Sequence, residues 1–347
     1  MKKTLTINTP GKLYIMGEYG VVYGTHALIL TTKSTLNITL KPSTRSSLRS
    51  AHFSKPILFD MTTFKAVDHD FKPWALAIET AIRYLQQKGF PLTPCEIAIN
   101  SGLDDAQHHS YGLGSSAALV VGLCDALTQW AGITLDALTL TKMAIYSQWS
   151  RQHTNSFGDM ATSSFKETLF YHKVDASWLS NLKGDLKDIV EQPWQGLVCE
   201  PLKHPKIPLL IFNTGVKTPS ETLVSAVAPF FQSKEAASWL QAMDQSVIKA
   251  KNALMKGTFS QFNQVMHLQR DLHTKLAQIT QAPLFIDAYE TLDKQYQPWL
   301  EASKFSGAGG GDNYLVSLTK DAFKLGDWRV VQSPYPLIQS AIQGVLE

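Results

Sequence analysis

The chain has 347 residues, of which 44% are hydrophobic and 18% are charged. This balance supports a sizeable buried core and about two domains, and it argues against long disordered segments. The net charge of +3 is too small to indicate nucleic acid or an anionic membrane as a partner. No apolar run approaches the length of a membrane span, and the N-terminus lacks the apolar segment of a signal peptide. We therefore expect a cytoplasmic protein.

The cysteine and histidine positions give no sign of a metal site or a disulfide framework. Cys95, Cys124 and Cys199 are far apart, have apolar neighbours and show no CxxC spacing, so we expect free thiols in a reducing compartment. His108 and His109 have no third ligand at metal spacing and are predicted to be loop residues.

In the N-terminal half, the pattern predicts strands and turns followed by helices. The polar and basic stretch 43–54 predicts a solvent-exposed hairpin tip, with a nucleotide contact as the alternative. The run Thr9-Pro10-Gly11 predicts a turn between two short strands. The remaining elements expected here are strands at 5–8, 12–16, 27–30, 36–40, 95–100 and 168–174, a helix at 74–87, and helices over 116–149.

Prolines cluster between residues 193 and 208, and we place a domain boundary there. The predicted domains are residues 1–200 and 201–347. The second one alternates helices with strands, and the chain as a whole predicts an α+β fold of packed layers. Its expected elements are strands at 209–213, 315–318 and 328–331 and helices at 220–231, 236–255, 259–277 and 284–295.

The most informative motif is GLGSSAA at residues 112–118, which leads directly into an apolar helix. Glycines and hydroxyl residues at a helix start leave backbone N–H groups unpaired, and the helix dipole favours negative charge at that end. The motif therefore indicates a phosphate site for a nucleotide. It is not a Walker loop, because no lysine follows Gly114 at the required place. A simple helix entry capped by serine is the alternative.

Two further motifs accompany this loop. Residues 10–24 place Lys12 just after the Pro10-Gly11 pair, with Glu18 and Tyr19 close behind. Residues 304–312 read KFSGAGGGD, whose glycines permit close backbone approach and positive φ. Each segment alone is compatible with ordinary strand and turn sequence. Together with the first loop they favour a site at which two anionic ligands meet.

In chain order, the motifs at residues 10–24, 112–118 and 304–312 resemble those of the GHMP kinases. The resemblance covers essentially the whole chain. It implies an N-terminal domain with a left-handed βαβ topology, a ferredoxin-like C-terminal domain and ATP bound over residues 112–118. Within that superfamily the chain is most similar to the phosphomevalonate kinases. The segments that carry this finer resemblance are GEY at 17–19, NSFGDMA at 155–161, the TG-x-x-x-PS-x-x-LV pattern within 213–224, the arginine-bearing stretch from Gln269 and the GGGD at 309–312.

Two positions depart from the usual phosphomevalonate kinase pattern. Asn313 stands where that family usually has cysteine, and Phe157 replaces a smaller residue. Neither change alters the charge of the site, so we expect both to be tolerated.

The resemblance implies transfer of the γ-phosphoryl group of ATP to 5-phosphomevalonate, which gives 5-diphosphomevalonate and ADP in the mevalonate route to isoprenoids. It assigns Lys12 and Asp159 to catalysis and Mg²⁺ as a cofactor held by the Ser116 hydroxyl. It assigns ATP to Gly112, Leu113, Gly114, Ser115, Ser116 and Ala117.

For Asp159 the chemistry predicts a modified role. The second pKa of a phosphate monoester is about 6, so the acceptor is already mostly ionised at neutral pH and needs no general base. We therefore expect Asp159 mainly to pair with and orient Lys12.

The resemblance and the polarity of the motifs predict acceptor contacts from a further group of residues. For Lys217 and Arg270 a solvated surface role is the alternative, and for Glu18 and Tyr19 a structural role is the alternative. The predicted acceptor-binding residues are Glu18, Tyr19, Ser156, Lys217, Ser220, Arg270, Gly307, Ala308 and Gly309.

Two other functions remain open at this point. The chain resembles, less closely, a mevalonate kinase or another small-alcohol kinase, and a non-catalytic binding protein of the same fold is a third possibility. In each case the expected partner is a small molecule, with neither nucleic acid nor membrane, and the expected assembly is a monomer or a homodimer.

Overall fold

The structure is a computed structural model that describes residues 3–51, 53–62, 72–104, 111–151, 155–319, 321–322, 333–343 and 345–346. The predicted strand at 328–331 and the predicted loop residues His108 and His109 lie outside these ranges. The chain divides into two compact units, each formed from separate stretches of sequence. Unit 1 comprises residues 1–12, 34–167 and 174–199, and unit 2 comprises residues 13–33, 168–173 and 200–347.

These units differ from the two continuous segments that the sequence predicts. The cause is the length of strands β1 (Leu5–Met16) and β2 (His26–Pro42), each of which begins in one unit and ends in the other. As a result, the motif at residues 10–24 is divided between the units. Lys12 is the last residue of its stretch of unit 1, whereas Glu18 and Tyr19 belong to unit 2.

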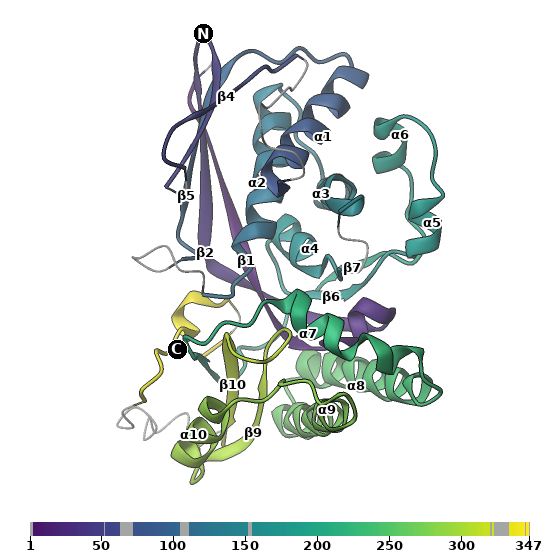
Figure 1. Ribbon diagram of the computed structural model, residues 1–347. Coiled ribbons are helices and arrows are strands. Elements are labelled where there is room, and N and C mark those ends of the chain that lie inside the picture. Colours follow the sequence, from purple (N-terminus) through teal and green to yellow (C-terminus); the bar gives the residue numbers. More distant parts are fainter. Residues whose placement is uncertain are drawn as a thin grey trace. The chain divides into compact units, whose positions relative to one another are not determined.

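Unit 1 combines one sheet with a layer of helices (Figure 1). Its strands follow the order β4-β3-β5-β2, in which β3 runs parallel to β5 and β2 runs antiparallel to β5. Because α1 lies between β3 and β5 in the chain, these elements form a β-α-β connection, whose left-handed sense stays a prediction. The bounds are β3 Ser46–Ser50, β4 Ile57–Phe59, α1 Pro73–Gln87, β5 Cys95–Ser101, α2 Ser115–Trp130, α3 Ala137–Trp149, α4 Gly158–Phe165, α5 Ala176–Ser180 and α6 Leu186–Glu191, with β7 at Val198–Pro201 crossing the unit boundary.

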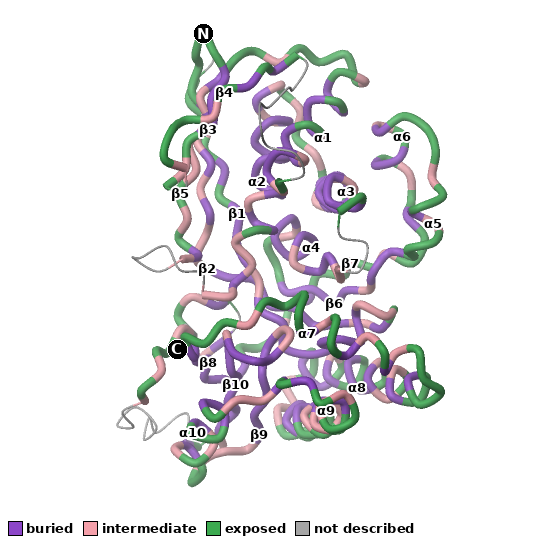
Figure 2. Tube along the Cα trace, viewed as in Figure 1, coloured by how far each residue is buried: buried purple, intermediate pink, exposed green. Residues whose placement is uncertain are grey.

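The core of unit 1 lies where α1, α2 and α3 pack against one another. Helix α2 is buried over most of its length, as the purple tube of Figure 2 shows. Its apolar run from Leu119 to Leu127 explains this, since a helix that is apolar on nearly all sides is stable only when it is surrounded. Helix α4 packs against both α2 and α3. The phosphate-loop helix therefore has a rigid setting.

Two predictions in this unit were wrong. Pro10 and Gly11 lie inside one continuous strand, β1, and not in a turn. Among the described strands β1 pairs only with β2, so the missing N–H of Pro10 is tolerated as it is at a sheet edge. The supposed hairpin tip at 43–54 contains β3, which pairs with β4 and β5 and buries Leu48, so its polar composition concealed an internal strand.

Unit 2 contains a three-stranded antiparallel sheet in the order β8-β10-β9, and the first part of β2 pairs with β6. Helix α9 packs against β9 and α8 packs against α9. Strand β9 was missed in the sequence because its residues Leu300–Phe305 alternate irregularly between polar and apolar. The bounds are η1 Gly20–Tyr23, β6 Leu169–His172, β8 Leu209–Asn213, α7 Ser220–Val227, η2 Ala228–Gln232, α8 Ala236–Lys256, α9 Phe259–Thr280, α10 Asp287–Tyr296, β9 Leu300–Phe305, β10 Asn313–Leu318 and η4 Gln339–Ala341.

The mixture of sheets and helices confirms the α+β fold class. In the part of the chain that the structure describes, we find no helix with the length and apolar character needed to span a membrane.

Candidate functional site

The phosphate loop opens helix α2 in unit 1. Gly114 is the N-cap residue, with φ of 79°, and it offers no side chain to cap the helix. Within the described residues, the N–H groups of Ser115, Ser116 and Ala117 donate no hydrogen bond, and the first bond of the helix runs from Ala118 N to Gly114 O. This helix entry therefore has unpaired donors at the positive end of a 16-residue helix, which is the arrangement that binds phosphate.

Lys12 lies directly against this loop. Its backbone N donates to the carbonyl oxygen of Leu113 at 2.8 Å, and its Nζ lies 3.4 Å from the carbonyl oxygen of Gly112. The approach is close: a Cβ on Gly11 would stand 2.1 Å from the oxygen of Leu113. Glycine is required there because two backbones meet, and the contact holds the lysine ammonium beside the predicted phosphate site.

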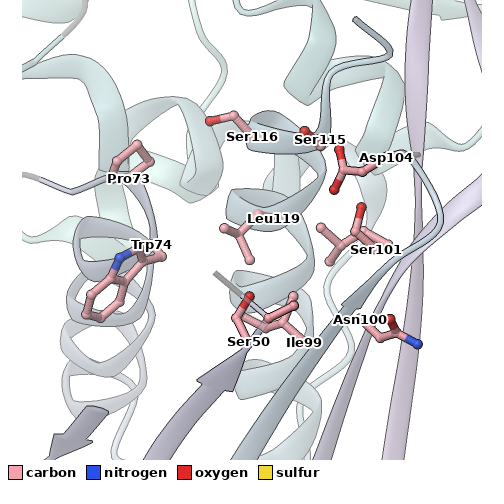
Figure 3. Close-up of a pocket in the computed structure, with 12 residues that line it drawn as sticks. Ser50, Pro73, Trp74, Ile99, Asn100, Ser101, Asp104, Ser115, Ser116 and Leu119 are labelled. Atoms are coloured by element: carbon pink, nitrogen blue, oxygen red, sulfur yellow. The ribbon is translucent and has the colours of Figure 1, made fainter. Parts of the chain in front are cut away.

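A cavity of about 280 Å³ begins at the same helix end (Figure 3). Ser115 and Ser116 line it together with Asp104, which lies near Ser115 in the view, and Trp74 of α1. Its volume is close to the lower end for small-molecule sites. The other lining residues are Leu36, Ser50, Ala51, Pro73, Ile99, Asn100, Ser101 and Leu119. Apolar walls beside a helix end with unpaired N–H groups are what a nucleotide site requires.

Asp159 occupies the first turn of α4, one residue after Gly158 begins the helix. Its Oδ1 accepts a hydrogen bond from Met160 N at 2.9 Å, as expected for a carboxylate at the positive end of a helix. Ser156 lies just before this helix and is half-buried. Pairing of Asp159 with Lys12 stays a prediction.

In unit 2, Glu18 and Tyr19 make contacts within the protein. The Glu18 carboxylate forms an ion pair with Lys304 Nζ, and both side chains are almost completely buried. Tyr19 donates through its hydroxyl to the carbonyl oxygen of Ala308 at 2.5 Å. Burial, together with the nearby positive charge of Lys304, lowers the pKa of His273 to about 3, so this neighbour of the Glu18 backbone is neutral. These contacts favour the structural alternative for both motif residues.

The glycine-rich loop at 307–311 is braced by the segment 214–220. Thr218 Oγ1 donates to Gly310 O at 2.7 Å, and Asp312 N donates to Val216 O at 2.7 Å. Two predicted acceptor ligands, Lys217 and Ser220, belong to this same segment and are exposed. Lys217 and Ser220 are therefore sequence neighbours of the residues that hold the loop. Their contact with an acceptor stays a prediction.

Arg270 is engaged within unit 2. Its Nη1 lies 2.7 Å from Asp293 Oδ2 and donates to the hydroxyl of Tyr314 at 2.9 Å and to Ser303 Oγ. This network joins α9 to α10, β9 and β10. The solvated surface alternative does not describe it, and its contacts favour a bracing role over an acceptor ligand.

Left-handed backbone at residues other than glycine occurs in two of the three motifs, at 10–24 and 304–312, and in the segment 155–161 before α4. Five such residues are described, and three of them, Tyr19, Phe157 and Asp312, lie in or beside the motifs. Each costs of order 1–3 kcal/mol, and strain of this kind gathers at functional sites. At Phe157 the ring, buried and 5.7 Å from that of Trp149, offsets the cost. The other departure from the family pattern, Asn313, accepts a hydrogen bond from Asn213 Nδ2 at 3.0 Å across strands β10 and β8.

The described residues contain no cluster of three or more histidine, cysteine or acidic side chains suited to a metal ion. The absence of such a cluster is compatible with Mg²⁺, because that ion is held mainly by substrate phosphates and needs only one or two protein oxygens. Ser116 provides a hydroxyl oxygen at the open helix end, and Asp104 lines the same cavity.

Residues 75–167 match the family model of the GHMP kinases N terminal domain. The phosphomevalonate kinase of Streptomyces sp. (strain CL190) is 22% identical over 343 residues, which covers 92% of this chain and 91% of that protein. Among solved structures, the Lin0012 protein from Listeria innocua matches with a TM-score of 0.87 and 25% identity over 97% of this chain and 98% of its own.

The Streptococcus pneumoniae phosphomevalonate kinase, solved with phosphomevalonate and AMPPNP, matches with a TM-score of 0.81 and 22% identity over 96% of this chain and 100% of its own. The chain therefore has the GHMP kinase fold, and its resemblance to the phosphomevalonate kinases is confirmed.

Some residues that shape the site were missed in the sequence. Lys304, Thr218 and Tyr289 hold the motifs through contacts distant in the chain, and Trp74 lines the cavity from α1. The sequence signal for Lys304 was a lysine close to the apolar residues Ala302 and Phe305.

Proposed function

We propose that this protein is an ATP-dependent kinase that phosphorylates 5-phosphomevalonate to 5-diphosphomevalonate. The observation that carries the proposal is Lys12 held against the open N-terminal end of α2 beside the cavity. The fold and the resemblance to phosphomevalonate kinases support the choice of acceptor. We also propose that the reaction takes place in the cytoplasm.

In the proposed reaction an oxygen of the acceptor's phosphate attacks the γ-phosphorus of ATP. The bond between that phosphorus and the β–γ bridging oxygen breaks, and ADP leaves with the electron pair. Such transfers depend mainly on positioning and on neutralising charge. The N–H groups of Ser115, Ser116 and Ala117 hold the nucleotide's phosphates, and Lys12 lies close enough to this loop to neutralise charge on the transferred group.

Asp159 has a supporting role in this scheme. An ionised phosphate monoester needs no base, so the carboxylate is expected to orient the Lys12 ammonium. When bound, Mg²⁺ would neutralise charge between the nucleotide's phosphates, and Ser116 would hold it through its hydroxyl. For the acceptor, the exposed Lys217 and Ser220 and the backbone of 307–309 are the proposed contacts.

The test is a coupled assay of ADP release with Mg·ATP, in which 5-phosphomevalonate, mevalonate, galactose and homoserine are compared as acceptors. Lys12→Met serves as the matched inactive control. We expect turnover on phosphomevalonate that depends on Lys12, and a diphosphate product by mass spectrometry.

Turnover on mevalonate instead would refute the assignment of the acceptor and support the small-alcohol kinase. If nucleotide binds and no acceptor is phosphorylated, the non-catalytic binding protein becomes the better description.

A further inference from the structure

The carbonyl groups of the glycine-rich loop in unit 2 are held by side-chain hydroxyls from three separate segments. Tyr19 donates to Ala308 O at 2.5 Å, Thr218 Oγ1 donates to Gly310 O at 2.7 Å, and Tyr289 donates to Gly311 O at 2.6 Å. Tyr19 belongs to the motif at residues 10–24, Thr218 lies just before α7, and Tyr289 lies on α10.

Tyr289 holds both polar groups of one residue. Its hydroxyl donates to the oxygen of Gly311 and also accepts from the nitrogen of Gly311 at 2.9 Å. Gly311 has φ of 139°, and a Cβ there would stand 2.3 Å from Val216 O, so no other residue fits this conformation. The Tyr289 hydroxyl therefore fixes a peptide geometry that only glycine can adopt.

The tyrosine is itself firmly placed. Its ring is stacked on that of Tyr314 with centroids 4.4 Å apart and planes 9° apart, and the Tyr314 hydroxyl bonds to Asp293 and accepts from Arg270. Burial raises the pKa of Tyr289, so its hydroxyl remains protonated and able to donate. The Arg270 network thus reaches the loop through one stacked pair of rings.

Backbone donors remain at the start of the loop, and one of them, Gly309 N, shares its peptide group with the Ala308 carbonyl that Tyr19 holds. The N–H groups of Gly307, Ala308 and Gly309 make no hydrogen bond within the described residues, whereas Gly310 N donates to Leu284 O at 2.8 Å. Gly307 and Gly309 both have positive φ. Successive N–H groups in such a turn form a concave anion-binding nest.

We propose that Tyr289 is a positioning residue: together with Thr218 it fixes the end of the loop at residues 310 and 311, while Tyr19 holds Ala308 O, and the loop fixed in this way presents the N–H groups of residues 307–309 to an anionic oxygen of the acceptor. Both the phosphate and the carboxylate of the acceptor have anionic oxygens that can accept hydrogen bonds from these N–H groups. The identity of the acceptor rests on the proposed function. The positioning role belongs to the loop and can be measured separately.

The principal variant is Tyr289→Phe, which removes the hydroxyl and keeps the stacked ring. Its matched control is Tyr296→Phe, a buried tyrosine on the same helix that packs on Phe212. Tyr289→Phe loses both hydrogen bonds to Gly311, so we expect it to raise the acceptor's KM at least about 5-fold, with kcat and the KM for ATP within about twofold. Tyr296→Phe should change none of these constants. Equal effects of the two variants would overturn the proposal.

A second pair of variants guards against poor folding of Tyr289→Phe. Thr218→Val should raise the acceptor's KM by a similar factor, while Thr218→Ser, which keeps a hydroxyl, should restore it. A Thr218→Ser variant as impaired as Thr218→Val would show that packing, and not the hydroxyl, matters, and would refute the positioning role.

A binding experiment separates this proposal from the proposed function. In the ¹⁵N-labelled wild-type protein, inorganic phosphate or acetate should shift the amide signals of residues 307–309, and Tyr289→Phe should weaken that binding at least about 5-fold. A response to phosphate alone indicates the phosphate as the bound group, and a response to acetate alone indicates the carboxylate. If phosphomevalonate is not a substrate, the proposed acceptor fails while these shifts still support the nest. Absence of shifts with either anion overturns the nest.

Discussion

Removing either partner of the buried Glu18–Lys304 pair is expected to destabilise the protein far more than removing both. The exposed fractions of the two side chains are 1% and 0%, so neither charge can regain water in the folded state. Lys304→Met leaves a carboxylate whose Oε2 already has no hydrogen-bond partner within the described structure. Leaving one such charge unpaired costs about 3–5 kcal/mol, whereas an apolar pair of similar volume is often neutral.

The assay is a double-mutant cycle with Glu18→Leu, Lys304→Met and the combined variant, measured by urea denaturation and thermal unfolding. At about 2–4 °C per kcal/mol for a domain of 150–250 residues, each single variant should lower Tm by about 6–20 °C. The combined variant should lie within about 2 kcal/mol of wild type, because Lys304 also loses its bond to Phe305 O. The coupling energy, which is the difference between the combined effect and the sum of the two single effects, should then be at least about 4 kcal/mol, above the usual range of about 0.5–3 kcal/mol for residues in contact.

Additive single effects, with a coupling below about 1 kcal/mol, would refute this reasoning. The same variants also address the role of Glu18. If Glu18 contacts the acceptor, the combined variant will be stable but will have a greatly raised KM. If its role is structural, stability and acceptor binding will recover together.

Three further outcomes are expected. Lys12→Met should lower kcat by about 10²–10³-fold and Asp159→Asn by about 10-fold or less, and the pH–rate profile should show no ionisation of a general base. Equal losses in the two variants would indicate that Asp159 acts as a general base. Ser116→Ala should raise the Mg²⁺ concentration at half-maximal activity about 10-fold while leaving Tm unchanged, and an unaltered Mg²⁺ requirement would exclude the hydroxyl as a ligand. Because the fold holds His273 neutral, with a pKa near 3 against 6.5 in the unfolded chain, the unfolding free energy should fall by about 1.4 kcal/mol per pH unit as pH drops below about 6.5. His273→Leu should reduce that slope in pH-dependent denaturation, and an unchanged slope would assign it to other groups.

Features of the site that depend on neighbouring residues could be predicted from the sequence. The phosphate loop is an example, because glycines, two serines and an apolar run together determine a helix entry with unpaired N–H groups. Helix α1 was predicted within one residue for the same reason: Gly89 and Pro91 end it locally.

The errors have a common physical cause, since they concern residues whose meaning depends on a distant partner. Gly11 was interpreted as part of a turn, but its lack of a side chain serves the close approach of β1 to Leu113, about 100 residues away in the chain. Strand β3 is polar in composition, yet it lies between β4 and β5 in the sheet, and its first three residues are buried. Local propensity contains no information about either neighbour.

The pair Glu18–Lys304 shows how much of this distant information is still recoverable. Its partners are 286 residues apart, yet Lys304 stands between apolar Ala302 and Phe305 at the end of a strand, where an unpaired ammonium would be too costly. A buried lysine of this kind requires a carboxylate, and Glu18 is one of several acidic residues that lie near a glycine among apolar residues, as Asp125 and Asp159 also do. The charge could therefore have predicted that a partner exists. The antiparallel register of β9 with β10, which directs the lysine to one face, was needed to decide which partner it is.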